Sequence, residues 1–235
     1  VDLSELATSV IAAAAGLAAE SFDSRAIIAD LATYVYTYGE ARGKTRAVLM
    51  QIYHHALHDR FYSARDLLLM SRLQETIGET DVKVQILFNR AMAQLGLAAF
   101  RSSLWSEAHE CLADLCNSGH ARELLAQGIF TMRGMERDED QENEERRRFV
   151  PHHMHINVEL LDACALICGM LQEVPNIAAA EHDPRRREIS VFYRRQLDGM
   201  DRRVFVGPPE SIRDYIMAAG LALAVGDWRK CATTI

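Results

Sequence analysis

Proline is absent from the first 150 of the 235 residues, and the five prolines of the chain lie between positions 151 and 209. Because proline removes a hydrogen-bond donor and clashes with the preceding helical turn, its absence leaves residues 1–150 free to be helical almost throughout. Apolar residues recur every three or four positions in residues 84–98 and 154–168, as they do on the buried face of a helix. Extended structure is expected only at residues 204–206. The pattern predicts an all-α fold.

Paired cysteine motifs are also missing, because the five cysteines are an odd number and contain no CxxC spacing. This excludes a complete disulfide framework and predicts reduced thiols in the cytosol. Cys164 and Cys168 share an apolar helix face, so we expect both to be buried as small hydrophobic side chains. The alanine-rich residues 10–19 lack a basic leader and are interrupted by Gly16, which predicts neither a signal peptide nor a membrane span. We therefore expect a cytoplasmic protein with no membrane partner.

Motifs for catalysis and nucleotide binding are missing as well, since no GxSxG, GxGxxG or glycine-rich phosphate loop occurs. The carboxylates are spread along solvated helix faces, so the sequence predicts no enzymatic activity and no cofactor. The remaining candidates for chemistry are two groups of histidines: His54, His55 and His58; and His152, His153 and His155.

Those histidines could in principle hold a metal ion, because His54 and His58 share a helix face at ligand spacing. Without CxxC or HExxH we expect no zinc site. The alternative is a zinc ion at His152, His153 and His155. We expect instead that His152, which follows Pro151, helps to cap the next helix, and that the other ring nitrogens bond the backbone or water.

Glycines separate the helix-forming segments and give the chain its organisation. The expected helices are residues 2–19, 25–38, 44–58, 60–77, 82–101, 104–117, 119–132, 154–173, 185–197 and 209–225. Seven acidic residues against one arginine in residues 136–145 indicate a solvated segment. The expected domain organisation is amino-terminal helices in 1–43, a first helical block in 44–133, a charged linker in 134–149 and a second block, truncated within a helix, in 150–235.

Helical repeats are indicated by residues 95–112, where small and large side chains follow the tetratricopeptide spacing. The small residues there would let two helices approach closely. Partial echoes occur at residues 61–64 and 226–231, but their spacing is unequal, which predicts an irregular right-handed solenoid. We expect Trp105 and Trp228 to be buried as anchors of helix pairs.

Basic residues are almost all arginine, 23 of 26, on a chain whose formal net charge is −7. The acidic total argues against nucleic-acid binding by the whole surface, so an RNA contact has to be a local patch. Guanidinium groups suit phosphate oxygens without reading bases. The basic clusters are Arg42, Lys44 and Arg46; Arg146, Arg147 and Arg148; and Arg185, Arg186 and Arg187.

For the middle cluster we expect ion pairs with the acidic run that precedes it. For the other two, contact with phosphate groups and internal pairing are both open. Gly39 and Gly43 predict an exposed turn for the first cluster. The last cluster is expected along a helix, where Glu188 can neutralise part of its charge.

A set of longer segments carries a resemblance to a known family. The segments are residues 52–58 (IYHHALH), 62–71 (YSARDLLLMS), 84–90 (VQILFNR), 122–128 (RELLAQG), 145–148 (ERRR), Pro151 with 155–157 (HIN), 185–187 (RRR), 207–211 (GPPES) and 226–228 (GDW). They resemble the c subunit of eukaryotic translation initiation factor 3 in the order in which that family has them, over residues 44–235. Residues 1–43 show no matching motif, and residues 134–143 depart from the family in detail.

The resemblance implies the helical-repeat arm of a PCI module, without the winged helix that ends such arms. It implies a non-catalytic scaffold that supports assembly of the factor and its seating on the small ribosomal subunit. The partners implied are the other subunits of the factor and ribosomal protein and RNA, while other initiation factors would bind regions outside this chain. The alternative is a scaffold subunit of another PCI complex, of the proteasome-lid or signalosome type.

Overall fold

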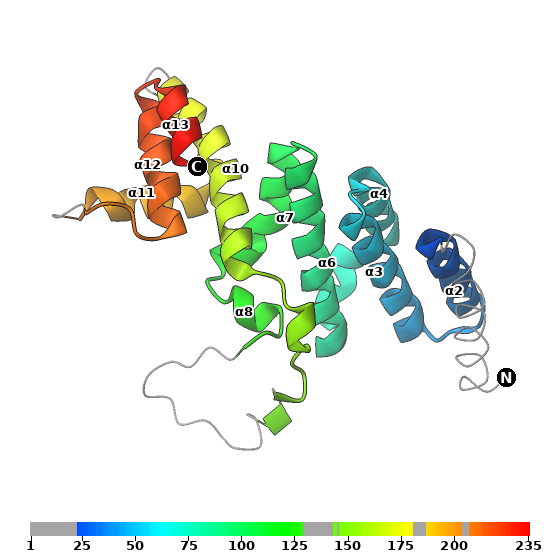
Figure 1. Ribbon diagram of the computed structural model, residues 1–235. Helices are drawn as coiled ribbons and strands as arrows, with labels where there is room; N and C mark the ends of the chain where they lie inside the picture. The colour runs from blue at the N-terminus through cyan, green and yellow to red at the C-terminus, as the bar shows by residue number, and fades with distance from the viewer. Residues whose placement is uncertain (1–22, 129–142, 145, 181–186, 204–206) are drawn as a thin grey trace.

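The computed structural model describes residues 23–128, 143–144, 146–180, 187–203 and 207–235. All regular elements in these ranges are helical, which confirms the predicted all-α class (Figure 1). The longer helices are α2 (Ser24–Tyr38), α3 (Ala41–Leu57), α4 (Phe61–Ser71), α6 (Val82–Arg101), α7 (Trp105–Asn117), α10 (Val158–Ala180), α11 (Val191–Asp201), α12 (Ile212–Ala224) and α13 (Trp228–Thr234). The short ones are α5 (Leu73–Thr76), α8 (Ala121–Leu124) and the 3-10 turns η1 (Ile77–Glu79) and η2 (His152–Met154).

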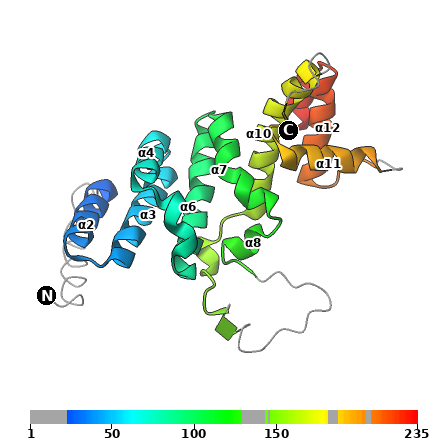
Figure 2. The same ribbon diagram turned by 180° about the vertical axis from the view of Figure 1, so that it is seen from behind.

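The helices lie side by side in an extended row, with α2 at one end and α11 to α13 at the other (Figures 1 and 2). Each helix packs mainly on its neighbours along the row: α2 on α3, α3 on α4 and α6, α6 on α7, α7 on α10, and α10 on α11 and α12. The α12 helix then packs on α13. Packing therefore continues from the first helical block into the second.

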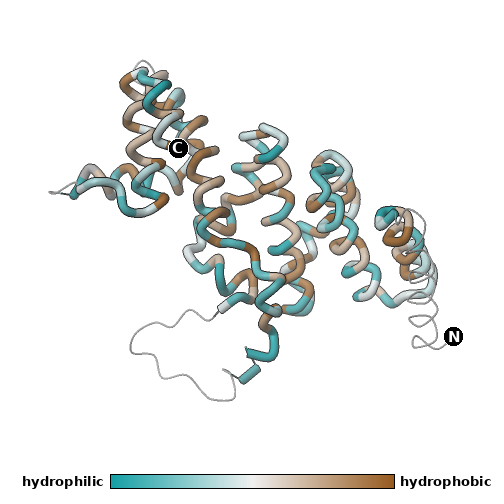
Figure 3. Tube along the Cα trace, viewed as in Figure 1, coloured by the Kyte–Doolittle hydropathy of each residue, from teal (hydrophilic) through white to brown (hydrophobic). Residues whose placement is uncertain are grey.

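Two clusters of buried apolar residues form the interior, and Phe100 packs against both of them. One lies between α3, α4, α6 and α7, and the other between α7, α10, α11 and α12. Figure 3 shows brown, apolar stretches along the helices of the row. Cys168 is buried in the first cluster and Cys164 in the second, so their predicted burial is confirmed.

The close contact between α6 and α7 depends on small residues. A Cβ atom on Gly96 would lie 2.6 Å from both Cγ and Cδ2 of Leu112. Ala99 and Ala108, on the two facing helices, are fully buried. The predicted close approach of these two helices is therefore confirmed.

Helix boundaries agree with the sequence at α6 and differ at Arg72 and Ala126, two non-glycine residues that take the left-handed conformation. The predicted helix 60–77 is wrong as a single element, because Arg72 has φ of 50° and separates α4 from α5. The predicted helix 119–132 is reduced to α8 in its described part, and Ala126 has φ of 54° just beyond it. Left-handed backbone is rare for these residue types, so neither break has a sequence signal.

The α10 helix begins later and ends later than predicted. Its first amides are bonded by Asn157, whose Oδ1 accepts from Glu159 N at 3.0 Å and Leu160 N at 3.3 Å. The interpretation of His152 as the cap is therefore wrong. The helix also continues through Pro175 to Ala180. Pro175 is exposed, so the carbonyl that loses its intrahelical partner is on the solvent side of the helix.

The α11 and α12 helices begin at serine caps rather than at the predicted positions 185 and 209. Ser190 accepts a hydrogen bond from Tyr193 N and caps the start of α11. The prediction that residues 187–190 are helical is therefore wrong. Ser211 forms a reciprocal capping box with Asp214 at the start of α12. The predicted helix 2–19 and the extended residues 204–206 lie outside the described residues.

The tryptophans are more exposed than predicted. Trp105 retains 38% of its exposure, and its ring meets Phe100 edge-on with centroids 5.5 Å apart. Trp228 retains 64%, and Arg229 lies over its ring at 5.4 Å. The expectation of full burial is wrong for both residues, because no described helix covers the outer side of either ring. Their role as anchors of helix pairs stays a prediction.

One segment, His152–Ala179, is long and apolar enough to cross a membrane by length and composition alone. Half of an apolar 18-residue stretch within it is buried inside the protein, where α10 packs against α7, α11 and α12. Core helices of soluble proteins have the same length and composition. The predicted absence of a membrane span therefore stays a prediction.

Candidate nucleic-acid interface

The first basic cluster lies on a helix and not in an exposed turn, which corrects the sequence interpretation. Gly39 closes α2 by donating its N–H to Val35 O at 2.8 Å, and α3 already begins at Ala41. Residues two apart on a helix point to different sides, so Lys44 cannot share a face with Arg42 and Arg46. The three residues form a cluster in the sequence but not in space.

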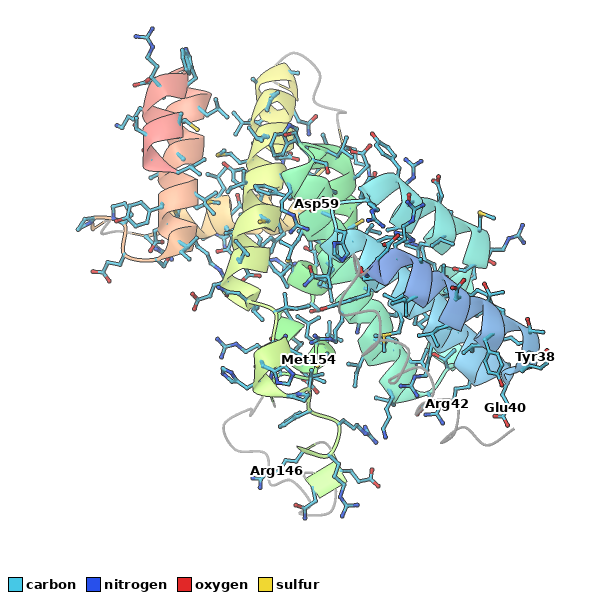
Figure 4. All side chains as sticks on the ribbon, turned by 45° about the vertical axis from the view of Figure 1, so that its right-hand side comes forward. Tyr38, Glu40, Arg42, Asp59, Arg146 and Met154 are labelled. Atoms are coloured by element: carbon cyan, nitrogen blue, oxygen red, sulfur yellow. The ribbon has the colours of Figure 1, made fainter. Side chains whose placement is uncertain are left out.

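Pairing further divides this cluster. Arg42 forms an ion pair with Asp81, the residue before α6. Lys44 and Arg46 are exposed, and their side chains form no hydrogen bond or ion pair with any described residue. Figure 4 shows Arg42 at the same end of the α2–α3 pair as Tyr38 and Glu40. Of the three candidates, Lys44 and Arg46 are the ones whose charges are free to meet a phosphate.

Of the last cluster, Arg185 and Arg186 lie outside the described residues. Arg187 is exposed, and its backbone carbonyl accepts a hydrogen bond from Asn176 Nδ2 at 3.1 Å. Glu188 lies 3.5 Å from Arg194 Nη1, so its charge is shared with an arginine of α11. The structure thus holds the backbone at the end of this cluster while the Arg187 side chain remains exposed.

The residue behind this arrangement is Glu173, a fully buried carboxylate of α10. It accepts the N–H groups of Ile189 and Ser190, each at 2.9 Å, and the Arg194 guanidinium at 2.5 Å. Burial alone would raise the pKa of Glu173, but these hydrogen bonds outweigh burial and hold the pKa below its usual value. Nothing in the sequence around a single glutamate inside an apolar run predicted this clamp.

The middle arginine cluster is partly paired, as expected. Arg148 Nη2 lies 3.3 Å from Glu144 one helical turn earlier, which confirms pairing with the acidic run for this residue. Arg147 is exposed. Figure 4 shows Arg146 on the segment that hangs below the row of helices.

The histidine groups make contacts with polar neighbours. His155 Nε2 donates to Val150 O at 2.9 Å, and His54 Nε2 lies 3.1 Å from Ser24 Oγ. Burial, followed by His58 and Arg60, lowers the pKa of His54. Among the described residues no group of three or more histidine, cysteine or acidic side chains has a metal-binding arrangement. That the chain binds no zinc stays a prediction.

A cavity of about 1050 Å³ lies between α8, α10, α11 and α12. Its charged walls pair with each other: Arg203 Nη1 lies 3.1 Å from Asp214 Oδ1, and Arg213 binds Asp162. Burial raises the pKa of the Cys116 thiol in its wall to about 12, so this thiol stays protonated and is a poor nucleophile. The described walls offer paired surface charges and no activated nucleophile.

Comparison with known proteins agrees with the resemblance that the sequence carries. The family model described as "Eukaryotic translation initiation factor 3 subunit 8 N-terminus" matches residues 4–184. The C subunit of eukaryotic translation initiation factor 3 from Bombyx mori is 51% identical over 203 residues, 86% of this chain and 23% of the relative. The proteins of the same name from Danio rerio and Culex quinquefasciatus are each 48% identical, over 92% and 94% of this chain.

These relatives are much longer than this chain, which spans about a quarter of their length. The match to the family model nevertheless includes most of the described helices and six of the nine segments that carry the resemblance, all but residues 185–187, 207–211 and 226–228. At this identity and coverage, the chain belongs to the C-subunit family of eukaryotic translation initiation factor 3, known in the family model as the N-terminus of subunit 8.

Proposed function

We propose that this chain is a non-catalytic scaffold segment of translation initiation factor 3, which supports assembly of the factor and its seating on the small ribosomal subunit. The observation that carries the proposal is the extended row of helices in which each helix packs mainly on its neighbours. Such a row exposes long lateral surfaces for partners, whereas a compact bundle exposes few. The partners proposed are the other subunits of the factor and the small ribosomal subunit.

Within this proposal the row is the irregular, right-handed, tetratricopeptide-like arm of a PCI module. The close α6–α7 pair built on Gly96 supports this interpretation. The unequal helix lengths support irregularity. The proposed blocks remain 1–43, 44–133 and 150–235, joined by the charged linker 134–149. The same proposal places the chain in the cytoplasm and gives it no cofactor.

Contact with ribosomal RNA is proposed for Lys44 and Arg46, with Arg42 and with Arg185, Arg186 and Arg187 as further candidates. Lys44 and Arg46 are exposed and form no ion pair with a described residue, so no internal pair is lost when they meet a phosphate. Arg42 is less suited because Asp81 already neutralises it. Phosphate contacts of this kind give affinity without sequence specificity.

The test uses the full-length subunit with Lys44→Glu and Arg46→Glu together, Arg187→Glu alone, and the parent. Each lost phosphate contact is expected to flatten the dependence of log affinity for small ribosomal subunits on log salt by about one unit. Co-purification of the other factor subunits should be unchanged. Unchanged affinity and slope in both variants would contradict RNA contact, and loss of binding together with co-purification would make the residues architectural.

The scaffold proposal has its own test, which is independent of these charges. The parent subunit is expected to co-purify with the other subunits of initiation factor 3 and to sediment with small ribosomal subunits. Co-purification with proteasome-lid or signalosome subunits would instead support the alternative.

A further inference from the structure

A concentration of basic side chains lies at one corner of the row, where α2 begins, α3 ends and the chain turns into α4. Three helical elements contribute to it, because the start of α2 packs on the end of α3 and Arg60 directly precedes α4. We call these residues the basic corner. They are Arg25, His54, His55, His58 and Arg60.

The members of the basic corner are held close together by the end of α3. The ring centroid of His54 lies 4.4 Å from that of His58 and 6.0 Å from that of His55. Arg60 N donates to His55 O at 3.0 Å, which brings the turn back onto the helix end. Ser24 Oγ, at the first residue of α2, is 3.1 Å from His54 Nε2.

Two nitrogens in this corner have no hydrogen-bond partner among the described residues. They are His55 Nδ1 and Arg60 Nη1, and both are shielded from solvent by their surroundings. Buried polar groups in proteins are nearly always hydrogen-bonded, so two unpaired nitrogens in one corner indicate a missing partner, which for the Arg60 guanidinium has to be an acceptor. Both side chains are only half-buried, so each also has atoms that reach the surface of the corner.

The carboxylates next to the corner in the sequence are already engaged. Asp23 caps α2 by accepting from Arg25 N at 3.0 Å. Asp59 accepts from Arg101 Nε at 2.5 Å. The C-terminal end of α3 offsets part of the positive charge through its dipole. Its carbonyls bond His58 N and Arg60 N, however, and give no acceptor to the two unpaired nitrogens.

The positive groups of the corner repel one another, and this repulsion affects the pKa of His55. Burial lowers the pKa of His55, and Arg60, His54, Arg25 and His58 lower it further. An added cation would meet this repulsion, whereas an added anion would relieve it. A metal ion is therefore disfavoured here although neutral imidazoles are available.

We propose that the basic corner binds a phosphate group, with Arg25, Arg60 and the imidazoles of His54, His55 and His58 as its donors. A phosphate presents several acceptor oxygens in different directions, which matches donors that come from α2, α3 and the α3–α4 turn. A phosphodiester of RNA and a small phosphate ester offer the same group. The proposal goes beyond ribosome seating, because it concerns neither Lys44 and Arg46 nor the Arg185 to Arg187 cluster.

The test is an NMR titration of the 235-residue chain with inorganic phosphate, against sodium chloride at equal ionic strength. Phosphate is expected to shift the ring signals of the three histidines and to raise the pKa of His54 and His55, because an anion stabilises imidazolium. Arg60→Gln should weaken phosphate binding about tenfold, the effect of one lost charge-assisted hydrogen bond. Lys83→Gln is the matched control, since Lys83 is exposed on α6 and loses the same charge.

Arg25→Gln repeats the measurement at an exposed position, so a folding defect of Arg60→Gln leaves the test intact. A short single-stranded RNA forms the second arm. If RNA competes with phosphate and Arg25→Gln weakens this competition, RNA supplies the phosphate group that the corner binds. If phosphate binds and RNA does not, the phosphate group comes from a small phosphate ester. Phosphate shifts no larger than those of chloride, or Arg25→Gln and Arg60→Gln binding like Lys83→Gln, would overturn the proposal. Neither result depends on binding to ribosomal subunits through Lys44 and Arg46.

Discussion

Two hairpins of this protein begin their second helix with tryptophan, yet they are packed very differently. In the α6–α7 hairpin, Trp105 meets Phe100, and Gln172 of α10 donates a hydrogen bond to its carbonyl at 3.0 Å. In the α12–α13 hairpin, Trp228 is mostly exposed and is contacted from one side by Arg229. The difference teaches that burial along such a row is set by the number of neighbouring layers and not by the residue motif.

The largest effect on the free energy of unfolding is expected when one leucine in each hairpin is replaced by alanine. Leu112 of α7 is fully buried against α6 and the second core, so Leu112→Ala should lower the free energy of unfolding by about 3 kcal/mol. Leu221 of α12 is 45% exposed, and Leu221→Ala should cost less than about 1 kcal/mol. Urea denaturation of both variants measures the contrast, and equal losses would break the comparison.

The tryptophans give the next effect. Trp105→Ala should cost about 2 kcal/mol, less than full burial would imply, because its ring is covered on one side by Phe100. Trp228→Ala should cost less than about 1 kcal/mol, since it loses a surface stack with arginine. Thermal melting of the two variants ranks them, and a larger loss at Trp228 would reverse the comparison.

Two glycine-to-alanine substitutions should change the free energy of unfolding in opposite directions. In Gly96→Ala the new methyl group meets Leu112, so overpacking should exceed the gain in helix propensity and destabilise by about 1 kcal/mol. Gly199 of α11 has no atom within 4 Å of an added Cβ, so Gly199→Ala should stabilise by about 0.5 kcal/mol. Chemical denaturation tests both, and stabilisation by Gly96→Ala would show that α6 and α7 can move apart.

The smallest effect extends the comparison to α2, which packs chiefly on α3. His54 and His55 have lowered pKa values in the folded chain, so the unfolded state binds more protons as the pH falls below about 6.5. Their contribution to stability is present above that pH and is lost as the pH falls through their folded pKa values. As the pH falls, protection against hydrogen exchange, taken relative to the intrinsic rate at each pH, should therefore decrease in α2 before α6 in phosphate-free buffer.

The histidine origin of this effect has a direct control. His54→Gln should reduce this loss of protection in α2, while His153→Gln, on the exposed η2 turn, should leave it unchanged. Equal protection of α2 on either side of the usual histidine pKa of about 6.5 would contradict the assignment.

The sequence predicted those parts of the fold that depend on local periodicity. The α6 helix has the predicted bounds, and the small residues that face α7 were recognised from their spacing. Breaks at Arg72 and Ala126 were missed because a left-handed conformation of these residues is imposed by packing and not by local preference. Continuation of α10 through Pro175 was missed because proline normally ends a helix.

The candidate site was less accessible to sequence reasoning. The close spacing of Arg42, Lys44 and Arg46 in the sequence suggested one basic patch. Helical geometry places Lys44 on a different side of α3 from the other two, and Arg42 is paired with Asp81. The basic corner went unrecognised because Arg25 lies far in sequence from His54 and Arg60, and only the packing of α2 on α3 brings them together. Such long-range proximity leaves no spacing to read.

The clamp made by Glu173 also bears on how this part of the chain can evolve. Because one carboxylate grips the amides of Ile189 and Ser190, the start of α11 is held by side-chain bonds and not by the length of the connection from α10. The entropy of closing a loop rises only slowly with its length. Insertions or deletions before residue 187 can therefore accumulate between lineages while α11 keeps its position, provided that Glu173, Asn176 and Arg194 are retained.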